Sequence, residues 1–371
     1  MTDIPAVSRD TATETRFPCE ECGADLRFAP GVTELTCAHC GHQQAITAKI
    51  SLQDATRELD FHAMLARLES NAPMEETRVT TCPNCGAQTE FQPDMHATEC
   101  PFCAAAVVAD TGTHRHIKPA ALVAFALTED TARKAMTDWL GRLWFAPNGL
   151  QDYARKGRAL NGIYVPYWTY DADTKSNYRG EKGVHYYETR TVTRNGKTET
   201  ERVQKTRWYP ASGRVARFFD DVLVLGSTSL PKRYTDGLAP WDLSGLLAYA
   251  PQYLAGFRAE GYQVPLDQGF TEARSIMDNQ ILADVRQDIG GDVQRVQDVD
   301  TDVSAITFKH ILLPVWLAAY KYRDRTFRFV VNGQTGKVQG ERPWSAWKIT
   351  FAVIVGLIVA GGIATVIAMN Q

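Results

Sequence analysis

The sequence predicts an α+β protein with two small four-cysteine modules, a mixed α+β domain with antiparallel hairpins, and one C-terminal apolar helix. Three observations predict this arrangement. They are four Cys-x-x-Cys pairs before residue 104, an Asn-Gly dipeptide between alternating polar runs, and twenty uncharged residues from Ile349 to Ala368. A chain of 371 residues with 44% hydrophobic and 22% charged residues has ordinary globular composition and is long enough for two or three domains.

The cysteines repeat as a module. All eight fall into two sets, and fourteen residues separate the two pairs within each set: Cys19, Cys22, Cys37 and Cys40, then Cys82, Cys85, Cys100 and Cys103. A shift of 63 residues superimposes the sets and also places Gly23 on Gly86 and Phe28 on Phe91. One module is therefore used twice. With no cysteine left for a disulfide elsewhere, this usage favours a reducing compartment and a metal.

Each Cys-x-x-Cys turn presents two thiolates, and two such turns complete the tetrahedral shell that zinc prefers. Because four thiolates leave no open position, we predict two zinc ions per chain, both structural. A redox dithiol is the alternative, but thioredoxin-like sites use a single pair. His39 and His42 could replace a ligand of the first site, although they read more simply as exposed loop histidines.

Between the two modules the sequence predicts one helix. Ser51 is its expected N-cap, Asn71 follows its end, and one side carries Leu52, Ala55, Leu59, Phe61, Leu65 and Leu68. Such a face packs onto the protein's own modules or docks a partner helix.

Residues 349–368 are predicted to span a membrane, because twenty helical residues cover ~30 Å of hydrocarbon. Arg342 and Lys348 precede this segment and no basic residue follows it. The positive-inside rule therefore predicts a single-pass tail anchor with a cytoplasmic N-terminus, consistent with the lack of an apolar N-terminal signal. A buried core helix is the alternative. Small residues recur every four positions in this segment, so packing against another membrane helix is also an open expectation.

Residues 118–343 are predicted to form an α+β cytoplasmic domain. Thr128 is expected to cap one helix, and a second is expected from about Thr271 to Ile289. The phrases 165–168 and 313–316 are related, and turns of related type are expected at 212–215 and 335–338. We therefore predict a weak internal duplication, with the prolines of the two phrases at strand starts.

Around Asn195-Gly196 the sequence predicts a long hairpin from about Tyr178 to Trp208, since Asn-Gly is a strong hairpin signal. Its basic residues could contact phosphates or lipid headgroups, but acidic residues alternate with them and a solvated charged hairpin is the simpler interpretation. The basic residues are Arg190, Arg194, Lys197, Arg202, Lys205 and Arg207.

No enzyme is predicted. Residues 333–337 lack the glycine spacing of a phosphate-binding loop, and Val338 stands where its hydroxyl residue would be, so a β-turn is expected there. His114, His116, His185 and His310 lack a neighbouring motif for catalysis.

The expected boundaries are a flexible N-terminus at 1–15, zinc ribbon 1 at 16–48, a linker helix at 49–74, zinc ribbon 2 at 75–110, the α+β domain at 118–343 and the transmembrane helix at 349–368.

The chain resembles bacterial membrane-anchored tandem zinc-ribbon proteins, which are labelled transcription-factor-IIB-type zinc-ribbon proteins or primosomal protein N-prime helicases. The resemblance rests on the paired cysteine motifs and on the phrases 144–147, 164–168, 219–224 and 331–338. The helicase activity does not carry over, because this sequence has no Walker loop. The resemblance implies an inner-membrane location and a scaffold that acts with membrane-stress proteins of the phage-shock type.

Two functions remain open at this point. The first is a membrane-tethered adaptor that recruits a protein partner. The second is a nucleic-acid-binding module, as many zinc ribbons are. Residues 1–117 hold 8 basic and 17 acidic side chains, a net −9 that leaves +6 for the remainder of the chain. Because phosphate binders are basic where they bind, nucleic acid is the less expected partner and a basic protein surface the better one.

Overall fold

The computed structural model describes residues 17–32, 34–46, 51–70, 76–81, 88–90, 97–99, 106–108, 111–115, 117–144, 160–194, 197–322, 325–341 and 345–369. It has mixed α+β architecture with antiparallel sheets, as the sequence predicts. The expected flexible segment 1–15 lies outside the described residues.

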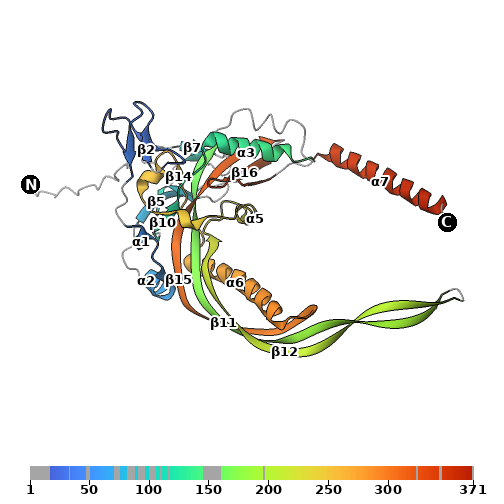
Figure 1. Ribbon diagram of the computed structural model, residues 1–371. Helices are drawn as coiled ribbons and strands as arrows, with labels where there is room; N and C mark the ends of the chain where they lie inside the picture. Colours follow the sequence, from blue (N-terminus) through green and yellow to red (C-terminus); the bar gives the residue numbers. More distant parts are fainter. Residues whose placement is uncertain are drawn as a thin grey trace, which may run out of the picture.

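A nine-stranded sheet forms the centre of the molecule (Figure 1). Its main path runs β12 (Lys197–Leu225), β11 (Asn161–Arg194), β15 (Val293–Tyr322), β10 (Ala121–Val123) and β13 (Leu246–Ala248). Four further strands join it: β14 (Arg258–Ala259) on β11, β16 (Arg325–Asn332) and β4 (Leu59–Asp60) on β15, and β17 (Val338–Gly340) on β16. Most pairs are antiparallel, but β10 runs parallel to β15 and β14 runs parallel to β11.

The predicted internal duplication is present in the architecture. A strand, a helix and a two-stranded hairpin occur in the order β10, α3 (Glu129–Gly141), β11, β12, and again as β14, α6 (Leu266–Ile289), β15, β16. The starts of the two helices lie 137 residues apart. The same shift carries the buried positions Ala132, Met136 and Leu140 of α3 onto buried positions Gly269, Ala273 and Met277 of α6. Each copy lends its first strand to the central strand of the other copy.

The expectation that the two repeated prolines begin strands is wrong. Pro166 and Pro314 lie inside β11 and β15, opposite Leu312 and Tyr164. Each proline carbonyl accepts a hydrogen bond from a glycine just beyond a neighbouring strand, at 2.9 Å from Gly226 and 2.8 Å from Gly333.

The carbonyls of these two glycines are already used. That of Gly226 accepts from the N–H groups of Gln263 and Val264, and that of Gly333 accepts from those of Ala126 and Leu127. Neither glycine carbonyl therefore lacks a donor when the residue opposite it has no N–H. Proline is for this reason tolerated at these two positions within the strands.

Of the two turns predicted from the sequence, one is absent and one is present. The turn expected at 212–215 is wrong, because Gly213 continues β12 opposite Tyr178. The turn at 335–338 is confirmed, with Gly336 at φ +77° and its N–H donating to the Asn332 carbonyl at 2.9 Å.

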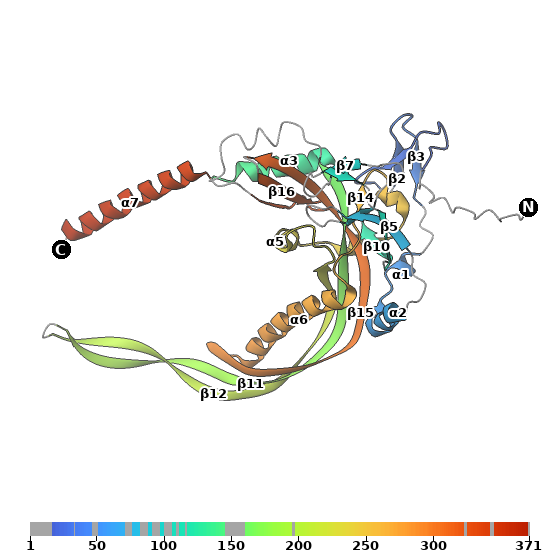
Figure 2. The same cartoon turned by 180° about the vertical axis from the view of Figure 1, so that it is seen from behind.

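The two copies differ most in their hairpins. β15 and β16 turn back between Tyr322 and Arg325, whereas β11 and β12 continue to the pair Arg194 and Lys197, the register expected for a two-residue loop. The predicted hairpin is therefore confirmed and forms a long arm. α6 lies inside the curve of the three long strands at the base of this arm (Figures 1 and 2).

The central helices follow their sequence signals in part. Thr128 caps α3 by accepting from the Thr131 N–H at 3.3 Å, as predicted. α6 ends at Ile289 with Gly290 as its C-cap, as predicted, but it begins at Leu266, five residues before the expected Thr271. Its N-cap is Pro265, in an extended conformation.

The prediction of a single linker helix is also wrong. The segment forms α1 (Leu52–Ala55), β4 and α2 (Phe61–Glu69). β4 pairs with Thr307 and Phe308 of β15, and the Asp60 carboxylate accepts from the Ala63 N–H at 2.7 Å, which starts a new helix.

The C-terminal helix α7 (Ala346–Met369) is long and apolar enough to cross a membrane. Its window Trp347–Ala364 has a mean hydropathy of 2.0, and none of that window is buried against the rest of the protein. A core helix of a soluble domain would instead be largely covered.

Candidate metal centre

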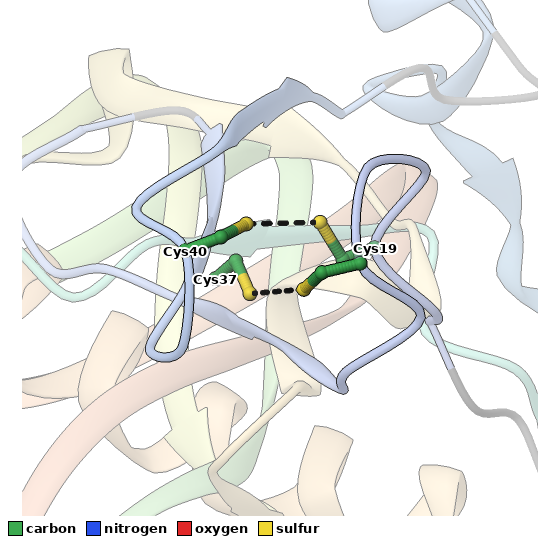
Figure 3. Close-up of side chains that lie close together, drawn as sticks. Cys19, Cys37 and Cys40 are labelled. Atoms are coloured by element: carbon green, nitrogen blue, oxygen red, sulfur yellow. Dashed lines mark hydrogen bonds between the residues drawn. The ribbon is translucent and has the colours of Figure 1, made fainter.

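Four cysteine sulfurs converge in the first ribbon. The Sγ atoms of Cys19, Cys22, Cys37 and Cys40 all lie within 4.8 Å of one another, and none forms a disulfide (Figure 3). Cys19 and Cys40 have sulfurs 3.6 Å apart, as do Cys22 and Cys37. Zinc–sulfur bonds of about 2.3 Å in a tetrahedron place neighbouring sulfurs about 3.8 Å apart. The spacing therefore fits a metal ion such as zinc.

The ribbon backbone explains how these sulfurs meet. The ribbon is a three-stranded sheet of β1 (Leu26–Phe28), β2 (Glu34–Cys37) and β3 (Gln43–Ala45). After each cysteine pair a glycine with positive φ closes the turn: Gly23 at +75° and Gly41 at +77°. Their N–H groups donate to the carbonyls of Cys19 at 2.8 Å and Cys37 at 3.0 Å. Glycine is needed because other residues rarely adopt this conformation.

The sulfurs do not titrate independently. Backbone N–H groups, that of Cys40 foremost, lower the pKa of the Cys37 thiol to about 6. The backbone at His42 lowers the pKa of Cys40, but the neighbouring sulfurs, that of Cys22 foremost, and desolvation together outweigh this and raise it to about 12. Four thiolates at this spacing therefore need a cation to coexist at neutral pH, which a divalent metal supplies. His39 and His42 lie outside this four-sulfur cluster.

The ribbon packs against the central domain. Phe28 places its ring edge-on to Tyr253 at 5.4 Å and to Phe257 at 6.0 Å between centroids, and its N–H donates to the Ala255 carbonyl at 2.9 Å. Cys19 and Cys37 are buried in the same hydrophobic cluster as Phe125 of the central domain. The metal-site turns are thus part of a continuous core.

The second predicted site cannot be compared in the same way. Cys82, Cys85, Cys100 and Cys103 lie outside the described residues. Strands around them are described: β5 (Glu76–Thr81), β6 (Gln88–Glu90), β7 (Ala97–Glu99), β8 (Ala106–Val108) and β9 (Thr111–Arg115). The second zinc ion stays a prediction from the 63-residue repeat.

A buried cluster of charged side chains around Lys309 was not predicted from the sequence. Lys309 is buried in β15, its Nζ lies 2.8 Å from Asp221 Oδ1, and it also pairs with Glu58. Asp171 accepts from the Asp221 N–H at 2.7 Å. A lysine inside the apolar run 306–317 was the available signal.

These three carboxylates gather around one ammonium group, which supplies the local cation. Burial raises the pKa of Glu58 to about 6 and also raises the pKa of Asp171. The cluster joins the segment after the first ribbon to the base of the arm, where β11 and β12 shift register.

The remaining candidate residues have structural contacts. His310 is buried, with Nδ1 2.6 Å from the Ile117 carbonyl, and His185 Nδ1 lies 3.0 Å from Thr206 Oγ1. On the arm, Arg202 stacks over Tyr187 and Arg207 over Tyr186, at 4.2 and 5.0 Å from the ring centroids. The side chains of Arg194 and Lys197, together with His114 and His116, are not among those that the structure describes.

Comparison with known proteins gives similarity without a function. The chain matches no protein-family profile, and no solved structure matches it. It is 27% identical over 335 residues, 90% of this chain and 91% of the other, to the uncharacterized protein YdjG of Bacillus subtilis (strain 168). The chain is thus similar to this protein along nearly its whole length.

Proposed function

We propose that this chain is a membrane-tethered zinc-ribbon adaptor, with the ribbons and the α+β domain on the cytoplasmic side of the inner membrane. The observation that carries the proposal is the first ribbon's packing: a closed four-sulfur site is fused through Phe28 to the core of a chain that also has a potential membrane helix. A closed shell has no position for substrate, so the metal would shape a surface rather than react.

The expected partner is a protein with a basic surface. Residues 1–117 carry a net charge of −9, and each four-thiolate zinc site would make this charge more negative by a formal −2. Such a field attracts cationic surfaces and repels nucleic-acid phosphates. The resemblance to membrane-anchored tandem zinc-ribbon proteins supports a partner of the membrane-stress type.

The decisive experiment compares full-length protein with Cys22→Ser and Glu21→Ser, both extracted from membranes in mild detergent. Glu21 is exposed and adjacent, but it carries no metal-site sulfur. The adaptor proposal expects a protein to be crosslinked in the membrane and co-purified with wild type and Glu21→Ser, and lost with Cys22→Ser. Co-purification of the same partner protein with Cys22→Ser as with wild type would contradict the adaptor proposal.

The same preparations distinguish the nucleic-acid alternative. Fluorescence anisotropy with labelled duplex and single-stranded DNA should show no binding by the full-length protein at physiological salt. Micromolar or tighter binding that falls steeply with salt, and that Cys22→Ser abolishes, would favour the alternative.

A separate experiment tests topology. Deleting residues 346–369 should release the chain from the membrane fraction, and protease added outside spheroplasts should leave the ribbons intact. Cleavage of the ribbons from outside would overturn the proposed orientation.

A further inference from the structure

The outer part of the arm is a two-stranded ribbon. We call residues 184–194 of β11 and 197–209 of β12 the distal arm. β15 accompanies β11 only as far as the pair Gly183 and Val293, and α6 ends at Ile289. Beyond that point β11 and β12 pair only with each other among the described strands. Because an isolated two-stranded hairpin is marginally stable in water, a further partner would stabilise the distal arm.

β12 offers an open edge for such a partner. It is the terminal strand of the sheet path, so no described strand hydrogen-bonds to its outer side. An exposed edge of this kind pairs readily with another strand. Pro210, which lacks an N–H, ends the uninterrupted edge, and the stretch 197–209 contains no proline.

The cross-strand register places most of the charged residues of the distal arm on one face, and Arg202 lies on the other. One face is dominated by uncharged hydroxyl side chains, including the directly opposite pair Thr191 and Thr200. The other face carries Glu188, Arg190, Glu201, Lys205 and Arg207. On that face Arg190 lies opposite Glu201, and Lys205 forms an ion pair with Glu188.

The β12 edge is complementary in charge to itself. When the stretch 197–209 is laid antiparallel against a second copy with Val203 facing Val203, Glu201 falls opposite Lys205. By position in the sequence, Glu199 falls opposite Arg207, and Thr200 falls opposite Thr206.

Each charged pair occurs twice in this arrangement, and no like charges face each other. Other registers are poorer. Centring the pair on Arg202 or Lys205 puts two like charges face to face, and centring it on Gln204 keeps only a Glu201–Arg207 pair.

We propose that two copies of this chain associate through the outer edge of β12 in the distal arm, antiparallel, with Val203 on the twofold axis. The product is a four-stranded ribbon that closes on itself, as an isologous twofold interface does. Its charged face then carries an alternating row: Arg190, Glu201, and Lys205 of the second copy.

The charges that favour a second copy also disfavour other strands. Lysine and arginine on an edge normally discourage pairing, because an unrelated strand leaves them buried against the wrong charge. In the Val203-centred register Lys205 and Arg207 each meet an opposite charge and Arg202 meets the neutral Gln204, so the edge selects its own sequence. The outer edge of β11 is the competing surface, since centring on Thr189 sets Arg190 opposite Glu188.

Cysteine crosslinking tests the interface in the full-length chain in its own membrane. The membrane is needed because the twofold axis stands perpendicular to the sheet and both α7 helices must enter the same bilayer. Val203→Cys should give a dimer band with a short bis-maleimide, because directly opposite Cβ atoms lie about 5 Å apart. Thr198→Cys is the matched control, since its two copies would be about 34 Å apart.

The parent chain with its eight native cysteines sets the background of this experiment. Crosslinking through Thr189→Cys but not Val203→Cys would overturn the proposal by placing the contact on β11. Equal crosslinking at Val203→Cys and Thr198→Cys, or none at either, would also overturn it.

A charge exchange then tests the register. In the Val203→Cys background, Glu201→Lys alone places two ammonium groups opposite each other, and Lys205→Glu alone places two carboxylates opposite. Each should reduce the dimer band more than about fivefold, since a single opposite-charge pair is worth up to about that factor.

Co-expressing the two variants with different tags should restore the mixed dimer, because every pair becomes complementary again. Damage inside one chain, such as loss of the Lys205–Glu188 pair, cannot be repaired by mixing. Failure of the mixed dimer to recover would therefore refute the pairing.

Discussion

Trp168 and Trp316 make the same hydrogen bond in the two copies of the central unit. The Trp168 indole N–H donates to the Val264 carbonyl at 2.9 Å, and that of Trp316 donates to the Leu127 carbonyl at 3.0 Å. Each acceptor lies one residue before the N-cap of a helix, Pro265 for α6 and Thr128 for α3. Each bond therefore ties the start of a helix from one copy to a central strand of the sheet.

Replacing either tryptophan by phenylalanine should destabilise the domain. Trp316→Phe and Trp168→Phe each leave a partly buried carbonyl without its donor, at a cost of up to about 1–3 kcal/mol. In thermal unfolding followed by near-UV circular dichroism, this corresponds to a Tm lower by about 2–4 °C per kcal/mol. Trp144→Phe, at a side chain that is 74% exposed, is the control. Shifts no larger than that of the control would show that the bonds contribute little.

Lys309 should be indispensable to the base of the arm. Lys309→Met leaves Glu58, Asp171 and Asp221 without their cation, and breaking a buried ion pair in this way costs about 3–5 kcal/mol. The variant should accumulate poorly and unfold at lower temperature. Adding Glu58→Gln and Asp221→Asn should recover part of the loss, because two of the three uncompensated carboxylates are neutralised. No recovery in the triple variant would argue that packing, not charge, explains the defect.

Glu58 should make stability depend on pH. Burial raises its pKa in the folded protein to about 6, above the ordinary value of 4.5, so the folded state binds the proton more tightly. The stabilisation from the protonated form is complete below about pH 4.5 and is lost as the pH rises through about 6. Glu58→Gln should remove about 1–2 kcal/mol of this pH dependence.

The measurement is the difference in Tm between wild type and variant across this pH range. Glu69→Gln, at an exposed position, is the control and should run parallel to wild type. A Glu58→Gln curve that also runs parallel would show that Glu58 titrates normally.

Local signals in the sequence predicted the elements that local chemistry determines. Thr128 marked a helix start because its hydroxyl caps that helix, and Asn195-Gly196 marked the hairpin because few residues accept such a turn. The four sulfurs of the first ribbon were predictable because metal ligation requires a fixed spacing.

Features set by distant partners were not predictable. Asp60 ends one segment and starts α2 because β4 pairs with β15 nearly 250 residues later, which no periodicity reveals. Likewise, the sequence placed Pro166 at a strand start. Its position inside β11 is tolerated because of hydrogen bonds among Pro166, Gly226 and Val264, which are distant in sequence. The pairing of Lys309 with Glu58 and Asp221 also depends on the fold, because these residues are far apart in the sequence.

Metal loading of the first ribbon should depend on its sulfurs and reach into the central domain. Purified protein should contain zinc with Zn–S distances of about 2.3 Å by X-ray absorption, and Cys40→Ser should remove one equivalent per chain. His39→Asn should leave the content unchanged, since His39 lies outside the four-sulfur cluster. A loss with His39→Asn would place that imidazole in the shell.

Because a ribbon this small depends on metal to fold, removing zinc should also release Phe28 from Tyr253 and Phe257. Chelation should therefore increase amide hydrogen exchange at the Phe28 N–H, which donates to the Ala255 carbonyl at 2.9 Å. Exchange in α6, distant from the ribbon in sequence and attached to the arm, should stay unchanged. Equal loosening of α6 would mean that the metal supports the whole domain; no loosening at Phe28 would mean that the ribbon holds its fold without the ion.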